Sequence, residues 1–183
     1  INSARTTLYC IVRYFREALI ITLEYKKKKY LSLQNDEERR SFFLKRRKWY
    51  NENKLYYENR IDCIENAALF IFLNKTCFNG LYRVNKKGLF NVPVGKYKNP
   101  NICNASLIRK DSELLQRVEI LTGDFEKTFE YAKGNTLFYF DPPYRPLTKT
   151  SAFTDYTKDA FNDASQIRLK EFCDKMISEE EQF

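Results

Sequence analysis

The turn Asp141-Pro142-Pro143-Tyr144 combines the groups best suited to chemistry in this sequence. Two consecutive prolines fix φ and remove two N–H donors, so the turn is stiff and its carbonyl groups remain available as acceptors. An exocyclic amine fits this set, because Asp141 and the Pro142 carbonyl can each accept an N–H hydrogen bond while Tyr144 stacks on the attached ring. Taken alone, the turn is equally well explained as a proline-rich exit from a strand with a solvated Asp141.

Two short apolar runs, residues 118–121 and 136–140, indicate the elements that position this turn. Each run is typical of a strand covered on both faces, and Asp124 between them can cap a short helix. Strand, helix and strand in this order predict a parallel α/β sheet. The turn then follows the carboxyl end of a strand, where open α/β sheets bind ligands. A closing amphipathic helix is predicted from the spacing of Leu169, Phe172, Cys173, Met176 and Ile177.

The N-terminal part of the chain is predicted to be helical. Apolar residues at helical spacing form one stripe from Leu8 to Leu23, and this first helix is expected to end near the lysine run at residues 26–29. Asn35 and Asp36 can cap a second helix. We expect its basic residues to form a solvated face, with contact to nucleic acid as the alternative. These residues are Arg39, Arg40, Lys45, Arg46, Arg47 and Lys48.

A third helix and a hairpin are predicted next. Asp62 with Glu65 resembles a capping box, and the almost wholly apolar residues 67–73 should bury the helix that it opens. Residues 76–100 read as an ordered loop or hairpin, in which lysine and arginine alternate with aromatic residues, and a short helix around residues 107–116 follows. Helical periodicity is broken within the loop by Gly80, Gly88, Pro93 and Gly95.

Composition narrows the classes of function. The balance of 32 Lys and Arg against 24 Asp and Glu gives a net charge of +8, which favours a polyanionic partner such as nucleic acid, although basic charge also serves solubility alone. The five cysteines are scattered and never spaced as C-x-x-C, which favours reduced thiols over a disulfide framework or zinc site. The absence of histidine excludes Ser-His triads and His-metal sites. We expect a cytoplasmic protein with no bound metal and no membrane segment.

Two signatures resemble one enzyme family. Asp-Pro-Pro-Tyr at residues 141–144 resembles the catalytic motif of amino-group DNA methyltransferases, and FLNKTCFNGLYRVN at residues 72–85 is similar to the DNA-contacting segment of Dam-type adenine methyltransferases, which act at GATC. The similarity continues through GLFNVPVGKY at residues 88–97 and resumes at residues 141–156. Motifs in the family's order cover residues 2–177, which is a specific match for short motifs.

The resemblance implies a fold and a division of the chain. The fold is α/β, a partial Rossmann-like methyltransferase sheet with an inserted, mostly helical DNA-recognition subdomain. Residues 1–25 would form the first helix of the catalytic domain, residues 26–105 the recognition subdomain with its basic hairpin, and residues 106–183 the catalytic α/β part. The implied activity is S-adenosylmethionine-dependent methylation of adenine N6 in duplex DNA, at GATC, by base flipping and direct transfer.

The resemblance also assigns roles to residues of the hairpin. Arg83 matches the guanine reader, since arginine can pair bidentately with guanine O6 and N7. Leu81 and Pro93 match contacts to a thymine methyl group, and Phe78 with Asn79 matches the pair that wedges beside the flipped base. Phosphate contacts are expected from Lys96, Tyr97 and Lys98, with Asn85 also among the DNA-binding residues. The alternative is a solvated basic hairpin.

Further roles concern the cofactor and the reaction. The resemblance implies that the catalytic residues are the four of the turn, Asp141, Pro142, Pro143 and Tyr144. The expected residues beside S-adenosylmethionine are Asp124, Phe125, Asp141 and Phe153. Asp124 has an alternative role as a helix N-cap. Phe153 resembles the family aromatic residue that closes over the cofactor or the target base, and core packing is the competing explanation.

The sequence departs from the family pattern in its cofactor elements. No G-x-G occurs, and the acidic residue that would hold the ribose hydroxyls is absent. We therefore expect a fragment that lacks the N-terminal glycine-rich cofactor loop and the C-terminal strands, and that neither binds cofactor tightly nor turns over by itself. The rival interpretation is a non-catalytic DNA-binding fragment. Methylation of an amine in RNA or on protein glutamine is disfavoured, because the glutamine enzymes resemble Asn-Pro-Pro-Tyr. A cognate restriction endonuclease is a possible partner.

Overall fold

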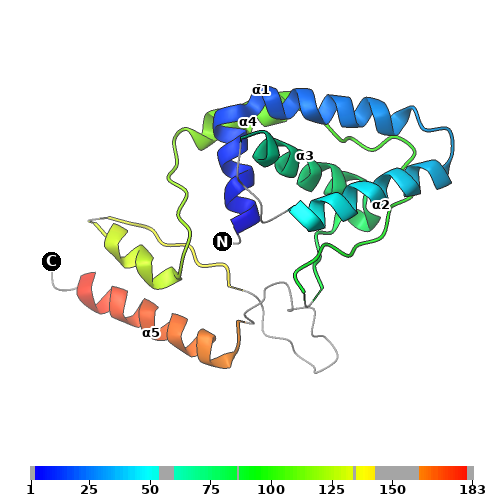
Figure 1. Ribbon diagram of the computed structural model, residues 1–183. Helices are drawn as coiled ribbons and strands as arrows, with labels where there is room; N and C mark the ends of the chain where they lie inside the picture. The colour runs from blue at the N-terminus through cyan, green and yellow to red at the C-terminus, as the bar shows by residue number, and fades with distance from the viewer. Residues whose placement is uncertain (1–2, 54–59, 86, 134, 143–160, 181–183) are drawn as a thin grey trace. The chain divides into compact units, whose positions relative to one another are not determined.

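The computed structural model describes residues 3–53, 60–85, 87–133, 135–142 and 161–180 (Figure 1). The chain divides into two compact units, Ile1–Thr122 and Gly123–Phe183. Unit 1 contains helices α1 (Ser3–Leu31), α2 (Asp36–Asn53), α3 (Arg60–Thr76) and α4 (Ala105–Leu115), with the 3-10 turn η1 (Phe78–Gly80). Unit 2 contains the 3-10 helix η2 (Phe125–Tyr131) and helix α5 (Asp163–Glu180). Within the described ranges, no helix is long and apolar enough to cross a membrane.

Helix α3 is the centre of unit 1. Residues 67–69, 72 and 73 are each at most 3% exposed, which confirms the prediction that this apolar stretch is buried. A helix that is apolar nearly all round must be covered on several sides, and both α1 and α2 pack against it. Phe72 lies edge-on to Tyr30 of α1 at 5.6 Å and to Phe42 of α2 at 5.8 Å between ring centroids. The three helices therefore share one aromatic core.

A buried ion pair also joins α1 to α3. Lys26 is only 4% exposed, and its Nζ donates to Glu65 Oε1 at 2.5 Å. Burial lowers the pKa of the Lys26 ammonium, and the hydrogen bond to Glu65 opposes that change. The predicted capping box is wrong, because the chain is already helical at Arg60 and Glu65 binds Lys26 instead.

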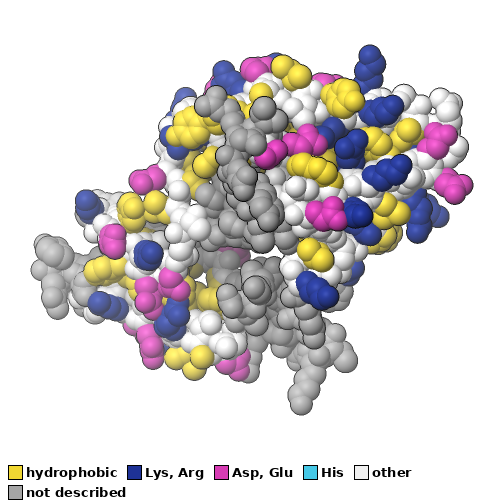
Figure 2. Space-filling model, viewed as in Figure 1, with side chains coloured by type: hydrophobic (Ala, Val, Ile, Leu, Met, Phe, Trp, Pro, Cys, Tyr) yellow, Lys and Arg dark blue, Asp and Glu magenta, His cyan; other side chains and the backbone are white. Residues whose placement is uncertain are grey.

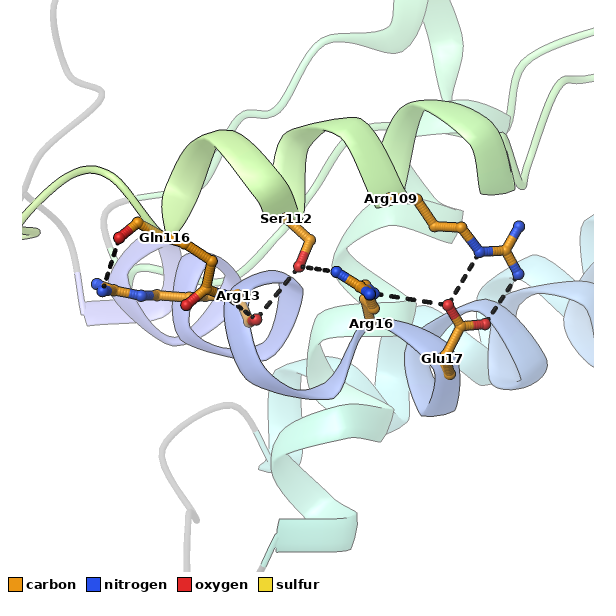
Figure 3. A network of polar contacts seen from close by, with 6 residues as sticks. All are labelled: Arg13, Arg16, Glu17, Arg109, Ser112 and Gln116. Carbon is orange, nitrogen blue, oxygen red and sulfur yellow. Dashed lines mark hydrogen bonds and ion pairs between the residues drawn. The ribbon is translucent and has the colours of Figure 1, made fainter.

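Helix α1 contains a break that α4 stabilises. Phe15 has non-helical angles of φ −129° and ψ 30°, although neither Pro nor Gly lies nearby. The carbonyl of Arg13, just before the break, accepts from Ser112 Oγ at 3.2 Å and from Gln116 Nε2 at 2.7 Å (Figure 3). Just after the break, Glu17 receives two hydrogen bonds from Arg109, at 2.8 and 2.9 Å. Polar side chains of α4 thus bind both sides of the break, and α1 continues to Leu31, beyond the predicted end.

Residues 77–85 and 87–98 form the hairpin that the sequence predicted, and we call them the hairpin. Its two arms meet in antiparallel bridges at Cys77 with Val94 and at Val84 with Phe90. Asn79 at φ 55° and Gly80 at φ 62° place two consecutive residues in the left-handed region, which reverses the chain tightly after α3.

Unit 2 is organised around Phe172 of α5, which is 8% exposed. The rings of Phe125, Phe129 and Phe140 surround it, with centroids 5.5, 6.4 and 6.0 Å away. The predicted short helix after Asp124 forms as the 3-10 helix η2, and the Asp124 carboxylate accepts from Glu126 N–H at 3.1 Å. The predicted closing helix is α5.

The predicted buried strands are not formed in the described part of the chain. Residues 118–121 and 136–140 run without strand pairing, and Val118 and Leu121 are 47% and 41% exposed. In residues 136–140 the side chains alternate: Leu137 is 94% and Tyr139 86% exposed, whereas Phe138 and Phe140 are half-buried. A parallel strand requires partners along its edges and cover on both faces. The described residues cover one face only, and a sheet is therefore not observed among them.

Candidate nucleic-acid interface and catalytic turn

The hairpin sorts its side chains by strand alternation. Phe90 and Val92 are buried in the core of unit 1, Tyr82 packs against that core, and Val84 is half-buried opposite Phe90. The positions between them point outward, as period-2 alternation requires. All nine residues predicted to contact DNA are exposed: Phe78, Asn79, Leu81, Arg83, Asn85, Pro93, Lys96, Tyr97 and Lys98. The inward residues therefore fix the hairpin, while the nine predicted DNA-binding residues are left exposed.

The base of the hairpin continues directly from the buried end of α3. Phe78 N–H donates to the Pro93 carbonyl at 2.9 Å, and Gly95 N–H donates to the Thr76 carbonyl at 2.8 Å. Cys77 is fully buried, which raises the pKa of its thiol. These bonds hold the turn, and Phe78 on it has 56% of its surface exposed. An exposed apolar ring held in this way resembles the side chains that insert between bases.

Glycine at position 95 allows Tyr97 to lie against the hairpin backbone. A Cβ atom at Gly95 would stand 2.8 Å from the Cys77 carbonyl oxygen and 2.6 Å from a carbon of the Tyr97 ring. Both distances are too short for any other residue without movement of the backbone or the ring. Tyr97 is 40% exposed, and its chain neighbours Lys96 and Lys98 are exposed as well.

Two asparagines organise the tip of the hairpin. Asn85 Oδ1 accepts from the N–H groups of Lys87 and Leu89, both at 3.0 Å, so this oxygen holds the turn together. Asn91 Oδ1 accepts from Arg83 Nε at 3.1 Å. That bond restrains the guanidinium from one side, so its two terminal nitrogens form the edge available to a ligand.

The electrostatic character of the hairpin is uniformly positive. Residues 76–100 contain no Asp or Glu, and their cations include Arg83, Lys87, Lys96 and Lys98 on exposed positions. On the face drawn in Figure 2, Lys and Arg side chains gather over the part of unit 1 where α1 and α2 lie, with Asp and Glu among them. A positive segment with interleaved aromatic residues is suited to a phosphate backbone.

Helix α2 binds the hairpin through its polar side chains. Arg39 donates to the Lys98 carbonyl at 3.2 Å and Arg47 to the Val92 carbonyl at 3.0 Å. Asn51 both donates to and accepts from the backbone of Phe90. The expectation of a solvated basic face is wrong for Arg39 and Arg47, although Arg40, Lys45 and Lys48 are exposed. Sequence reasoning missed these contacts, but the spacing of Arg39, Phe43, Arg47 and Asn51 at every fourth residue would have placed them on one face of α2.

Only the first half of the predicted catalytic turn lies within the described residues. Asp141 is exposed and Pro142 is half-buried, directly after the run that contacts Phe172 through Phe140. Pro143, Tyr144 and Phe153 lie outside the described residues. The recognition hairpin belongs to unit 1 and the turn to unit 2.

Comparison with known proteins shows to which family this chain belongs. The family model of D12 class N6 adenine-specific DNA methyltransferases matches residues 2–183.

The chain belongs to this D12 class.

A Type II methyltransferase, M.MjaIII of Methanocaldococcus jannaschii, is 49% identical over 176 residues, which cover 96% of this chain and 59% of that protein. The Type II methyltransferase M1.LlaDCHI of Lactococcus lactis is 47% identical over 62% of this chain and 40% of its own length. The DNA adenine methylase of Vibrio cholerae is 33% identical over 79% of this chain and 49% of its own length. The chain thus spans about half the length of these curated relatives.

D12 class methyltransferases generally use S-adenosylmethionine. Asp124 and Phe125 are the pair that resembles the border of the cofactor's adenine. One oxygen of Asp124 caps η2 and the other pairs with Arg168, which together hold the pKa of this carboxyl below its usual value. The Arg168 guanidinium also lies over the Phe125 ring, 4.6 Å from its centroid. In this arrangement Arg168, from the same unit, binds Asp124 and covers the ring of Phe125, so these two residues do not fit the cofactor.

Within residues 3–53, 60–85, 87–133, 135–142 and 161–180, no group of three or more His, Cys, Asp or Glu side chains is arranged to hold a metal ion. The prediction of a metal-free site stays a prediction.

Proposed function

We propose that this chain carries the DNA-recognition hairpin and the catalytic turn of an S-adenosylmethionine-dependent enzyme that methylates adenine N6 in duplex DNA, at GATC. Family membership supports adenine-specific DNA methylation. The observation that carries the finer proposal is the hairpin, which turns all nine predicted DNA-binding side chains outward while its alternate residues enter the core. Residues 26–105 would serve recognition, and residues 1–25 and 106–183 would belong to the catalytic part.

Recognition divides between backbone attraction and base reading. The lysines of the hairpin attract phosphates irrespective of sequence. Arg83, restrained through Nε by Asn91, presents its terminal nitrogens to guanine O6 and N7 in the major groove, a contact that carries sequence information. Leu81 and Pro93 supply apolar contact to a thymine methyl group. Phe78 and Asn79 fill the space beside the extruded adenine.

The catalytic turn acts on the adenine amine. The lone pair of that nitrogen is delocalised into the ring, which makes it a poor nucleophile. Asp141 and the Pro142 carbonyl accept its two hydrogens and so favour a pyramidal nitrogen with a localised lone pair. Tyr144 stacks on the flipped ring and holds it in line, which removes much of the entropic barrier. Asp141 need not be a strong base, because the proton can leave after the nitrogen has become cationic.

A non-catalytic DNA-binding role is the second candidate. One observation favours it: Asp124 and Phe125, which resemble cofactor contacts, are engaged by Arg168. In that case the hairpin would bind DNA, and unit 2 would serve only as structural support. We accordingly propose that the 183-residue chain by itself neither binds S-adenosylmethionine tightly nor turns over.

Fluorescence titration separates the two candidates. The 183-residue chain is titrated with duplexes that contain GATC or single-base variants of it, and separately with S-adenosylmethionine. Preference for GATC with no micromolar cofactor binding supports the proposal for this chain. Micromolar cofactor binding would refute the predicted inability to bind it, and equal affinity for all duplexes would refute the hairpin's role.

The catalytic role is tested on Asp141 in the complete gene product. Asp141→Ala should lower the methylation rate at least about a hundredfold, the usual cost of removing one group that stabilises the transition state, while duplex affinity stays within a few-fold. Asp174→Ala, which removes an exposed carboxylate paired with Lys170 on α5, is the matched control and should leave the rate unchanged. A methylation rate within a few-fold of the parent would remove Asp141 from the mechanism.

Two further proposals concern the cell. We propose a cytoplasmic location, where the DNA substrate is accessible, and pairing with a cognate restriction endonuclease of the same target sequence. Two relatives carry the name Type II methyltransferase, which supports the second proposal. Cleavage of GATC-containing DNA by a lysate of the source cell, blocked by prior methylation, would test it.

A further inference from the structure

Phe90 presents its backbone polar groups away from the opposite arm of the hairpin. It lies across from Val84 in an antiparallel bridge. The hydrogen bonds of this bridge flank the pair, from Asn85 N–H to the Leu89 carbonyl at 2.9 Å and from Asn91 N–H to the Arg83 carbonyl at 3.2 Å. In such a non-hydrogen-bonded pair, the N–H and C=O of Phe90 itself point outward, where a third strand would lie in a larger sheet.

The side chain of Asn51 occupies that third-strand position. Phe90 N–H donates to Asn51 Oδ1 at 2.8 Å, and Asn51 Nδ2 donates to the Phe90 carbonyl at 3.0 Å. A carboxamide carries one acceptor and two donors in a plane, so it pairs with a peptide group as a neighbouring strand does. Two bonds to one residue fix both its position along the arm and its rotation.

The contact is rigid because it is seated in the core. Phe90 is 2% exposed, and its ring meets Tyr50, the neighbour of Asn51 on α2, edge-on at 6.4 Å. Sliding the arm by one residue would place Leu89 or Asn91 opposite Asn51 and would turn Phe90 out of the core. Asn51 therefore holds one register.

The register of Phe90 controls the orientation of Arg83. Asn91 follows Phe90 directly, and it grips Arg83 twice, by the backbone bond described above and by Oδ1 to Arg83 Nε at 3.1 Å. The hydrogen bonds of Asn51 to Phe90, the peptide bond from Phe90 to Asn91 and the hydrogen bond of Asn91 to Arg83 thus connect α2 to the guanidinium. Arg83 is exposed, so without these restraints its long side chain would sample many rotamers.

We propose that Asn51 is a positioning residue for target recognition, which sets the hairpin register and thereby aims Arg83 at its base pair without touching DNA. This inference rests on the proposed function. It goes beyond it by assigning part of the sequence discrimination to a side chain of α2.

The test compares two asparagines of α2 in the full chain. Asn51→Ala removes both bonds to Phe90, and Asn51→Asp keeps the acceptor but loses the donor and sets a negative charge against the Phe90 carbonyl. Asn53→Ala is the matched control, because Asn53 Nδ2 bonds to the Trp49 carbonyl within α2 and not to the hairpin. The readout is the ratio of affinities for a GATC duplex and a duplex substituted at the base pair that Arg83 reads.

Asn51→Ala and Asn51→Asp should each lower this ratio about tenfold, within the range of one good bidentate base contact, while Asn53→Ala leaves it unchanged. In an Arg83→Ala background, Asn51→Ala should add no further loss, because the effect passes through Arg83. Hydrogen exchange of the Phe90 amide should accelerate in both Asn51 variants. If Asn51→Ala does not fold, Asn51→Asp carries the same comparison with a nearly isosteric side chain.

Other results overturn the inference. An unchanged ratio in Asn51→Ala, or an equal loss of affinity for both duplexes, would reduce Asn51 to a structural residue. A further loss in the Arg83→Ala background would show that Asn51 acts by another route. If the parent chain itself fails to discriminate between the duplexes, the proposed function fails and this inference with it; if the parent discriminates and Asn51→Ala does so equally, the inference alone fails.

Discussion

The two units of the chain differ in how firmly each holds the residues predicted to function. In the described residues, all the buried apolar side chains except Phe172 and Met176 lie in unit 1. The hairpin of unit 1 is fastened to that core by Tyr82, Phe90 and Val92 and by polar bonds from α2. The run that leads to Asp141 in unit 2 is covered on one face only, through Phe140. The residues predicted to recognise DNA are therefore held within unit 1, whereas the predicted catalytic turn has a far smaller supporting core.

The largest expected difference between the units is in stability. Phe72→Ala should lower the free energy of unfolding of unit 1 by about 3–5 kcal/mol, because it removes a fully buried ring between α1, α2 and α3. Phe172→Ala should have a smaller effect, since its aromatic cluster is more exposed. Urea denaturation followed by far-ultraviolet circular dichroism measures both. Leu137→Ala, at a side chain 94% exposed, is the control and should change little; equal losses for Phe72 and Phe172 would remove the contrast.

Within unit 1, a residue predicted to read a base and one predicted to bind phosphate should respond differently to substitution. Arg83→Ala should cost about 1–3 kcal/mol of discrimination at one base pair. Lys96→Ala should weaken binding to all duplexes alike and reduce the salt dependence, because it removes a sequence-independent phosphate contact. Titrations at two salt concentrations with cognate and substituted duplexes give both quantities. Unchanged site preference in Arg83→Ala would contradict its role as a base reader.

Asn79 allows backbone and side-chain roles to be separated. Its φ of 55° is left-handed, so Asn79→Ala should destabilise the turn by about 1 kcal/mol, while Asn79→Gly should leave stability nearly unchanged. If the side chain also wedges beside a flipped base, Asn79→Gly should still lose activity despite a normal melting temperature. Retention of full activity in Asn79→Gly would restrict Asn79 to shaping the turn.

The smallest expected effect is on stability at acid pH, where one carboxylate in each unit can be compared. Bonds from Glu126 N–H and Arg168 lower the pKa of Asp124, and Arg109 lowers that of Glu17. A carboxyl group whose folded pKa is lowered contributes stability above its unfolded pKa, near 4, and loses it as the pH falls below that value. Asp124→Asn should flatten this acid dependence for unit 2, and Glu17→Gln for unit 1. Denaturation between pH 3 and pH 6 would measure it, and both effects should be small because these groups are exposed.

Local patterns predicted much of the fold correctly. The apolar run of α3, the cap of η2 and the hairpin each depend on residues close in sequence, and all were predicted. The break at Phe15 could not be, because no Pro or Gly marks it and the groups that stabilise it, Ser112 and Gln116, lie about a hundred residues away. The strands at residues 118–121 and 136–140 were mispredicted for a related reason, since apolar composition indicates burial but not whether partner strands are present.

Only part of the candidate site was predicted, again because the sequence does not show which distant residues are in contact. Exposed residues of the hairpin carry motif information in their own order along the chain. Arg39, Arg47 and Asn51 carry none, because they bind carbonyl and N–H groups that every residue possesses. Their partners are therefore invisible in sequence, and only the four-residue spacing on α2 indicated a shared face.

The same contacts bear on how target choice changes during evolution. Because α2 holds the hairpin through hydrogen bonds to its backbone and through the inward ring of Phe90, outward side chains such as Arg83 and Lys96 can be replaced without removing these contacts. Natural variation can then explore new base preferences at little cost in folding. A protein engineer who randomised outward positions such as Leu81, Arg83 and Lys96, while keeping Asn85 at the tip, would retain these contacts throughout the library.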